Sequence, residues 1–231
     1  MRAPDLLRYS LLLATAATAH ANRRHYRMPT TWLPHLTINA AALLMPDVVR
    51  LIGARAQRPD GEGRPGLLQL ARETLTQVAA ENPGYVLHIA PFTAGYLTSH
   101  PQFDIYKGPM GELRLAGFGL DALPHGATAL ALTLLAGDAL RAAAQSCDRG
   151  SRLGRAIGWC AARRALATGG MLALLTLVWE SGEWLALRYE LRQRGDPAQI
   201  NMQWSIPDTL RDCAANAAGW ALACLVRREW M

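Results

Sequence analysis

Two glutamates interrupt the most apolar part of the sequence. Glu180 and Glu183 lie in VWESGEWLAL, residues 178–187, directly after the run GGMLALLTLVW. Because they are three residues apart, both lie on one face if the segment is helical. An ionisable group at membrane depth costs about 2.5 to 3.5 kcal/mol on insertion scales, so it normally faces the interior of a helix bundle. We therefore predict that both carboxylates point inward and that at least one contacts His125 or Arg211.

Two other apolar segments carry polar residues at helical spacing. Asp121 and His125 are four residues apart in one segment, and Asp208, Asp212 and Asn216 continue this spacing in the last one. If the three polar faces converge, they form a single buried cluster. Its candidate members are Asp121, His125, Glu180, Glu183, Asp208, Asp212 and Asn216.

Such a cluster suits three kinds of chemistry. Carboxylates with one imidazole could hold a zinc, manganese or iron ion that activates water, with His125, Glu180 and Glu183 as ligands. The chain lacks the HExxH and Glu-x-x-His spacings of common hydrolytic and diiron sites. The other two roles are a proton or ion path and a set of structural pairs with Arg188, Arg211 and His125. We expect the structural role and no cofactor, with a divalent metal as the alternative.

The elements that must position these residues are predicted to be helices. Ala and Leu dominate, and the alternation typical of strands is rare. Six apolar segments are separated by polar connections: 1–24, 31–54, 84–100, 120–140, 165–191 and 206–226. The sequence thus predicts an all-α protein, a polytopic transmembrane helix bundle of five to six spans with one amphipathic surface helix over 67–82.

The whole chain, residues 1–231, is predicted to be one membrane-embedded domain. It comprises N-terminal helices at 1–54, a cytoplasmic loop with the amphipathic helix at 55–83, and a core at 84–231. The basic start and the Ala19-x-Ala21 ending resemble a secretory signal peptide, but threonines interrupt the apolar stretch. We favour an uncleaved first span, while a cleaved or surface-lying segment at 1–21 stays open.

The charge pattern indicates a lipid bilayer as partner. The formal net charge is +6, and the hydrophobic fraction is 51%. The arginines are scattered between apolar runs without a zinc-finger or RNP-type motif, which argues against nucleic acid. Four cysteines without CxxC spacing are expected to be small buried side chains.

Arginine also predicts the orientation. Residues 141–164 carry six arginines against one aspartate, and Arg227 and Arg228 follow the last apolar segment. Positive residues accumulate on the cytoplasmic side of membrane proteins, so residues 141–164 and the C-terminus should be cytoplasmic.

Several stretches resemble the DUF2238, or YjdF-like, family of bacterial inner-membrane proteins, which is related to the VanZ-like group. They are LHIAPFTAGYLTSHPQFDIYKGP, GFGLDALPHGATALAL, VWESGEWLAL and RGDPAQINMQWSIPDTLRDCAANAAGWAL, in the family's order over residues 84–225. His125 matches the family's helix-opening histidine, and Glu180, Glu183 and Trp184 match its E..EW pattern. Asp208, Asp212 and Asn216 match its last helix. The chain departs from the family where GDALR stands in place of an Arg-Glu pair.

The resemblance implies a multi-pass protein of the bacterial inner membrane without an assigned activity. We expect a non-catalytic accessory or scaffold subunit that packs against lipids or other membrane-protein subunits. The alternative, suggested by the VanZ-like kinship, is a small metal-assisted hydrolase or transferase that uses the His/Glu/Asp cluster on an envelope lipid or cell-wall precursor.

Overall fold

The computed structural model describes residues 3–55, 67–195, 200 and 204–230, and these are almost entirely helical. The all-α prediction is therefore confirmed. The helices are α1 (Ala3–Tyr26), α2 (Leu33–Arg55), α3 (Leu67–Leu75), α4 (Tyr85–Leu97), α5 (Gly108–Glu112), α6 (Ala122–Ser146), α7 (Arg152–Ala162), α8 (Arg164–Arg194) and α9 (Ile206–Val226).

Short elements join or end the helices. Two 3-10 turns, η1 (Pro29–Thr31) and η4 (Arg228–Trp230), precede α2 and follow α9, and a π turn, η2 (Thr76–Ala80), continues α3. The sequence did not predict the small antiparallel hairpin of β1 (Arg114–Leu115) and β2 (Phe118–Gly119). Gly117, at φ +87°, lies in its turn, where a residue without a side chain adopts the left-handed conformation without strain.

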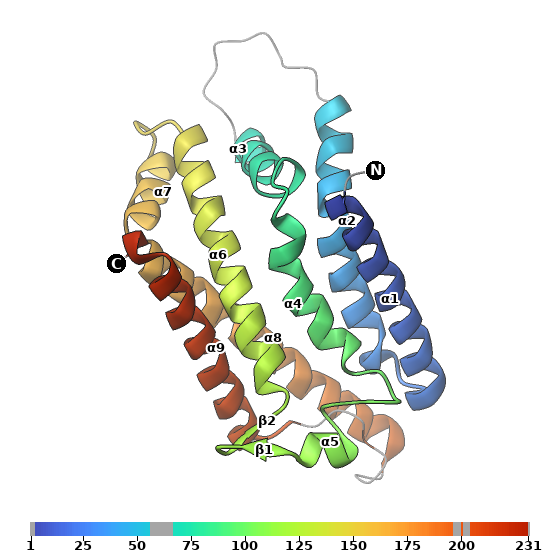
Figure 1. The fold of residues 1–231 in the computed structure, drawn as a ribbon. Helices are drawn as coiled ribbons and strands as arrows, with labels where there is room; N and C mark the ends of the chain where they lie inside the picture. Colours follow the sequence, from blue (N-terminus) through green and yellow to red (C-terminus); the bar gives the residue numbers. More distant parts are fainter. Residues whose placement is uncertain (1–2, 56–66, 196–199, 201–203, 231) are drawn as a thin grey trace.

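Six helices form the body of the molecule and run alternately in opposite directions. These are α1, α2, α4, α6, α8 and α9 (Figure 1). The N-terminus, α3 and α7 lie toward one end, whereas α5 and the hairpin lie at the other. The C-terminus lies beside α7 in the same view. It is held against α6, because Arg227 lies 3.7 Å from Asp138 and the buried Trp230 ring packs onto Gly137. Below, "α7 end" and "hairpin end" denote the two ends of the bundle.

Within the described residues, three segments are long and apolar enough to cross a membrane: Pro29–Ile52, Ala122–Ser146 and Arg164–Arg194. They include most of α2 and all of α6 and α8. Helix α4 is only 13 residues long, which at 1.5 Å per residue gives about 20 Å, against a hydrocarbon core of about 30 Å.

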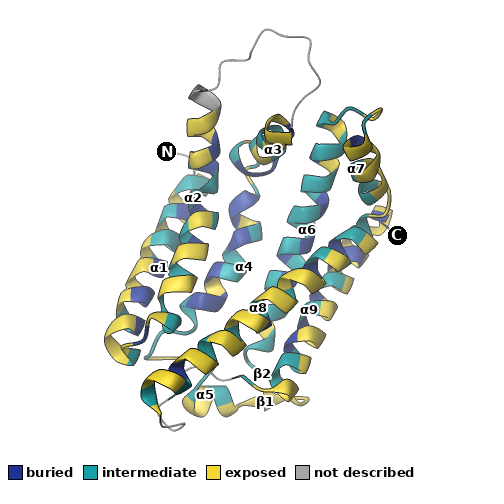
Figure 2. Cartoon of the chain, turned by 180° about the vertical axis from the view of Figure 1, so that it is seen from behind, coloured by how far each residue is buried: buried dark blue, intermediate teal, exposed yellow. Residues whose placement is uncertain are grey.

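The surface of these helices is strongly apolar. On α8, Leu174, Leu177, Val178 and Leu185 are each about 60% exposed, and Figure 2 shows exposed residues along the length of this helix. Soluble monomers rarely expose contiguous apolar surface on this scale. The outer face of α8 therefore suits contact with lipid or with another membrane protein.

Helices α6 and α9 pack closely because small residues meet where they cross. A Cβ atom added to Gly219 would lie 2.9 Å from both Ala129 Cβ and Leu130 N, and it would collide with the carbonyl oxygen of Gly126. Ala129, Ala215 and Ala223 are also buried. Small residues permit such close backbone approach between membrane helices.

A second packed region forms around α2, η2 and α4. Its buried side chains are Leu43, Ala79, Tyr85 and Ile89. The predicted amphipathic helix supplies part of it, since Leu70 and Val78 are buried while Leu67 and Leu68 are exposed.

Two predictions require correction. The basic stretch 141–164 is more than a connection, because it contains the regular helix α7, whose N-cap Ser151 accepts a hydrogen bond from Gly154 N at 2.9 Å. Only one of the four cysteines, Cys224, is buried. Cys147 and Cys160 are half-buried, and Cys213 is exposed because it lies on the outer side of α9.

The α6–α9 crossing gives a test of the packing. Gly219→Ala should lower the free energy of unfolding by about 1 to 3 kcal/mol, as overpacking of a tight contact does. Gly170→Ala is the matched control, because an added Cβ on this helical glycine of α8 meets nothing within 4 Å. The free energy of unfolding of the Gly170→Ala control should stay unchanged or rise by up to about 1 kcal/mol, because Ala has a higher helix propensity than Gly. Unfolding of the detergent-purified variants measures both, and equal behaviour would contradict the packing argument.

Candidate functional site

A row of polar contacts runs along the interface between α8 and α9. Glu180 Oε2 accepts a hydrogen bond from Thr209 Oγ1 at 2.6 Å, and Asn216 Nδ2 donates to Thr176 Oγ1 at 3.0 Å. Toward the α7 end, Trp220 Nε1 donates to the carbonyl of Ala165 at 3.1 Å. Because the helices are antiparallel, these contacts follow one another along the interface. We call this row the polar seam.

The two glutamates differ in their surroundings. Glu180 is buried at 7% exposure, whereas Glu183 is half-buried and accepts a hydrogen bond from Trp179 Nε1 at 2.9 Å. The predicted contact with His125 or Arg211 is not among the described contacts of either carboxylate. Thr209 faces Glu180 instead, and Arg211 forms an ion pair at 3.1 Å with Asp208, one turn earlier on its own helix.

His125 connects α6 to the seam through Asp212. Its Nε2 lies 3.7 Å from Asp212 Oδ1, a separation that is long for a hydrogen bond but within ion-pair range when the imidazole is protonated. Asp212 is buried at 6% exposure, and it lies three residues after Thr209 on the same face of α9. The three predicted faces therefore do meet, with His125 opposite Asp212 and Glu180 opposite Thr209.

The remaining candidates act at helix starts or along the seam. Asp121 is the N-cap of α6 and accepts a hydrogen bond from Ala122 N at 3.1 Å. Asp208 lies in the first turn of α9, where a negative charge complements the helix dipole. Asn216 belongs to the seam. Thus Asp121 and Asp208 have local structural partners.

The arrangement does not assemble the hypothesised metal ligands. In the described parts of the chain, no group of three His, Cys, Asp or Glu side chains is placed to hold a metal ion. Glu183 turns toward Trp179, and His125 faces Asp212. What this geometry supports directly is hydrogen-bonded pairing between helices.

An aromatic cluster adjoins Glu183 on the side of α2 and α4. His35 stacks on Tyr96 at 4.9 Å between ring centroids and meets Trp179 edge-on at 5.5 Å. Phe92 also lies edge-on to Trp179 at 6.3 Å. His35 was not predicted as part of a site, because a single histidine in an apolar segment carries no spacing signal. Through Trp179, this cluster connects α8 to α2 and α4.

A buried ion-pair group at the α7 end was also missed. Arg8 is 3% exposed, donates to the carbonyl of Leu43 at 2.7 Å and forms a two-pronged contact with Asp47, one arm of which is 3.0 Å long. Asp5 accepts from Arg8 at 3.1 Å, and Arg50 lies 3.6 Å from both aspartates. The spacing of three between Asp5 and Arg8, and between Asp47 and Arg50, could have indicated this group.

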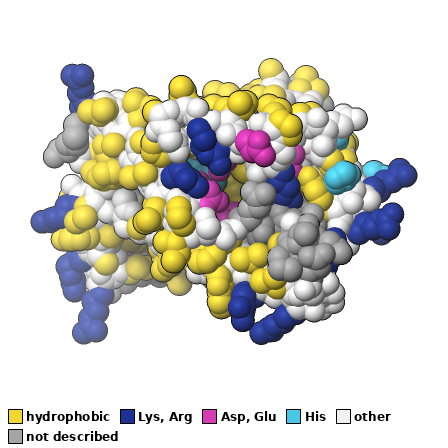
Figure 3. All heavy atoms as spheres, turned by 90° about the horizontal axis from the view of Figure 1, so that it is seen from below, with side chains coloured by type: hydrophobic (Ala, Val, Ile, Leu, Met, Phe, Trp, Pro, Cys, Tyr) yellow, Lys and Arg dark blue, Asp and Glu magenta, His cyan; other side chains and the backbone are white. Residues whose placement is uncertain are grey.

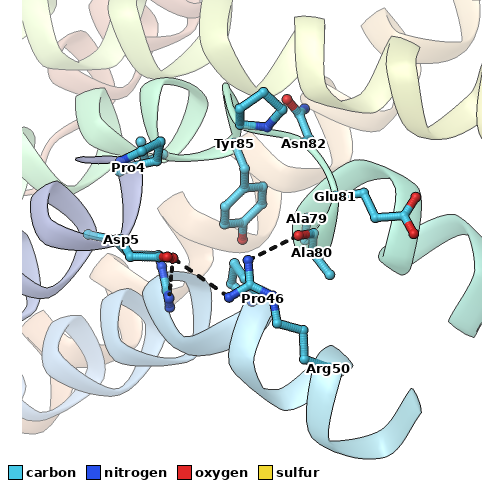
Figure 4. Close-up of a pocket in the computed structure, with 12 residues that line it drawn as sticks. Pro4, Asp5, Pro46, Arg50, Ala79, Ala80, Glu81, Asn82 and Tyr85 are labelled. Carbon is cyan, nitrogen blue, oxygen red and sulfur yellow. Dashed lines mark hydrogen bonds and ion pairs between the residues drawn. The ribbon is translucent and has the colours of Figure 1, made fainter. Parts of the chain in front are cut away.

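A small cavity lies beside these ion pairs. Asp5 and Arg50 line one side of it, and residues 79–86 line the other (Figure 4). Its volume is about 50 Å³, enough for a few water molecules, since one needs about 10 to 15 Å³ by this measure. It is too small for an organic substrate.

The hairpin end holds a third polar group. Tyr26 Oη donates to Asp104 Oδ2 at 2.7 Å, Lys107 Nζ lies 4.3 Å from the Tyr26 ring centre, and Arg194 donates to the Tyr26 carbonyl at 2.6 Å. Burial lowers the pKa of Lys107, although the nearby Asp104 carboxylate opposes this shift. Seen from this end, acidic and basic side chains lie close together, with hydrophobic side chains around them (Figure 3).

Comparison with known proteins adds no assignment. No protein-family model, curated protein or solved structure matches this chain.

The seam gives a prediction about Glu180. Glu180→Gln keeps an oxygen that accepts from Thr209, so it should change the free energy of unfolding by less than about 1 kcal/mol. Glu180→Leu removes that acceptor and leaves the Thr209 hydroxyl unsatisfied, which should cost about 1 to 3 kcal/mol. Thermal unfolding of the purified variants measures the difference.

Thr209→Val supplies the control for this pair. If the hydrogen bond carries the effect, Glu180→Leu should cost much less in the Thr209→Val background than in the wild type. Equal stability of the Gln and Leu variants would contradict the prediction.

Proposed function

We propose that this chain is a six-span integral protein of the bacterial inner membrane, with α1, α2, α4, α6, α8 and α9 as the spans. The apolar surface of α8 and the alternating directions of the six helices support this proposal. Helices α1, α4 and α9 are shorter or more polar than independent spans. Their polar residues, such as Asn22, Thr93 and Asp212, are buried against neighbouring helices, which is how membrane bundles accommodate them.

In this proposal the α7 end faces the cytoplasm. Six of the chain's arginines lie between residues 141 and 164 at that end, and the C-terminal Arg227 and Arg228 lie beside them. The proposed resemblance to DUF2238 proteins over residues 84–225 would place the chain in the bacterial inner membrane, whereas the orientation rests on the arginines.

We further propose that the protein acts as a non-catalytic scaffold or accessory subunit. The observation that carries this is the seam, in which Glu180, Asn216 and Trp220 each have a partner on the facing helix. Paired polar groups of this kind fix how helices pack. The apolar outer face of α8 would then meet lipid or another membrane-protein subunit.

One observation favours the alternative of a membrane enzyme. Glu180 Oε1 is buried without a hydrogen-bond partner in the described structure, and His125 and Asp212 lie on the two helices opposite. A carboxylate oxygen without a partner, together with an imidazole, can serve acid–base or metal chemistry.

Two measurements separate scaffold from enzyme. We expect purified protein to contain no stoichiometric divalent metal by elemental analysis. The Glu180→Gln and Asp212→Asn variants are then expressed in a strain that lacks the gene and has a growth defect. For a scaffold, each variant should restore growth in proportion to the amount of folded protein in the membrane. Bound metal, or a failed complementation at wild-type protein levels, would favour the enzyme.

The topology is tested with two single-cysteine reporters in a background without the four native cysteines. Arg149→Cys, before α7, should resist a membrane-impermeant thiol reagent in whole cells, because we place it in the cytoplasm. Glu112→Cys, in α5 at the hairpin end, should react readily. Both positions are exposed, so accessibility to solvent is matched.

Alkaline carbonate extraction completes this test, since an integral protein stays in the membrane pellet. Release into the supernatant would refute membrane integration. Labelling of Arg149→Cys but not Glu112→Cys would reverse the orientation, and equal labelling of both reporters would refute the six-span arrangement.

A further inference from the structure

Helix α7 carries one exposed stripe that the scaffold role does not explain. Arg152, Arg155 and Trp159 occur at i, i+3 and i+7 of α7, so they lie on one side of the helix, and Arg163, its C-cap, follows them at i+11. All four are exposed, and Trp159 is 50% exposed. Gly154, on the opposite side, is buried. We call these four residues the α7 stripe.

The stripe combines guanidinium groups with an aromatic ring. The Arg163 guanidinium lies 4.9 Å from the centre of the Trp159 ring, and Arg155 donates to the Gly150 carbonyl at 2.7 Å. Stacking and hydrogen bonding hold these two arginines in place, and each retains further N–H donors. Guanidinium groups bind phosphate oxygens in a two-pronged geometry.

The position of the stripe matches the edge of the proposed hydrocarbon layer. Immediately after Arg163 and Arg164, the exposed side chains of α8 become apolar, beginning with Leu166 at 63% exposure. On α9, exposed Leu225 and Val226 give way to Arg227 and the exposed Arg228. Both spans therefore change from apolar to arginine surface at this end. Indole rings such as Trp159 prefer this interfacial level.

We infer that the α7 stripe binds the phosphate groups of anionic phospholipids in the leaflet at the α7 end. This inference rests on the proposed membrane integration and adds a partner to it. The six arginines of residues 141–164 face a single aspartate, so the segment has an excess of five positive charges (6 − 1 = 5). Anionic headgroups complement that excess, whereas a zwitterionic surface does not.

To test the inference, full-length protein purified in detergent is titrated with phosphatidylglycerol and, separately, with phosphatidylcholine. Native mass spectrometry counts the lipid molecules bound. Wild type should bind phosphatidylglycerol at least about tenfold more tightly, and Arg152→Gln with Arg163→Gln should weaken that binding by about tenfold. Binding of phosphatidylcholine should not change.

Arg24→Gln with Arg192→Gln is the matched control. It removes the same charge from two exposed arginines near the hairpin end and should leave the lipid preference intact. Arg152→Lys with Arg163→Lys keeps the charge, so it should retain most of the preference. It also provides a folded comparison if the Gln variant unfolds.

Three outcomes would overturn the inference. They are the absence of a preference for phosphatidylglycerol, an equal loss in both Gln variants, and displacement of the lipid by millimolar inorganic phosphate, which would indicate a site for a soluble anion. The protein used in the titration is taken only from the membrane fraction that resists carbonate extraction, so that membrane integration is tested before lipid binding. A soluble protein would therefore refute the proposed membrane integration, whereas a membrane protein without the lipid preference would refute this inference alone.

Discussion

The need to pair polar groups inside an apolar bundle governs this structure. Glu180, Glu190, Asp212 and Arg8 are all buried at 7% exposure or less, on helices whose outer faces are leucine-rich. A buried charge without a partner costs several kcal/mol, so each must meet a complementary group from another segment. Arg8 meets Asp47, Glu180 meets Thr209, and Glu190 accepts a hydrogen bond from Thr30 at 2.5 Å. These contacts join segments far apart in the sequence and thereby specify which helices are neighbours.

Close packing at α6 and α9 makes the seam possible. Gly219 lets α9 approach the backbone of α6 at Gly126, which brings Asp212 to within ion-pair distance of His125. Helix α8 packs against both of these helices and contacts α9 through Thr176 and Glu180. A bulkier residue at Gly219 would separate the helices, so the small residues and the polar pairs act as one unit.

The sequence predicted what depends on periodicity and failed where pairing is decided in three dimensions. The all-α class, the amphipathic helix at 67–82 and the inward position of Glu180 follow from spacing and composition. The partner of Glu180 does not, because a neutral hydroxyl such as that of Thr209 can also donate to a buried carboxyl group, and spacing along one helix does not show which residue of another helix lies opposite. Arg8 was missed because its partner Asp47 is 39 residues away. The spacing of three between Asp5 and Arg8 indicates a local pair, but it does not show which distant segment completes the group.

Charged and aromatic side chains occur at both ends of the bundle, but the Tyr26 group and the α7 stripe use them differently. At the hairpin end, three polar side chains have contacts that centre on Tyr26: Tyr26 donates to Asp104, Lys107 lies over its ring, and Arg194 donates to its carbonyl. In the α7 stripe the three arginines are exposed, and one of them, Arg163, stacks on the exposed Trp159 ring. The donors of the Tyr26 group are used in contacts within the protein. Arg163, which stacks on Trp159, keeps N–H donors that are free to bind a group outside the protein. The Tyr26 group and the α7 stripe therefore differ in where their donors point: the former bind within the protein, whereas the latter face the surroundings.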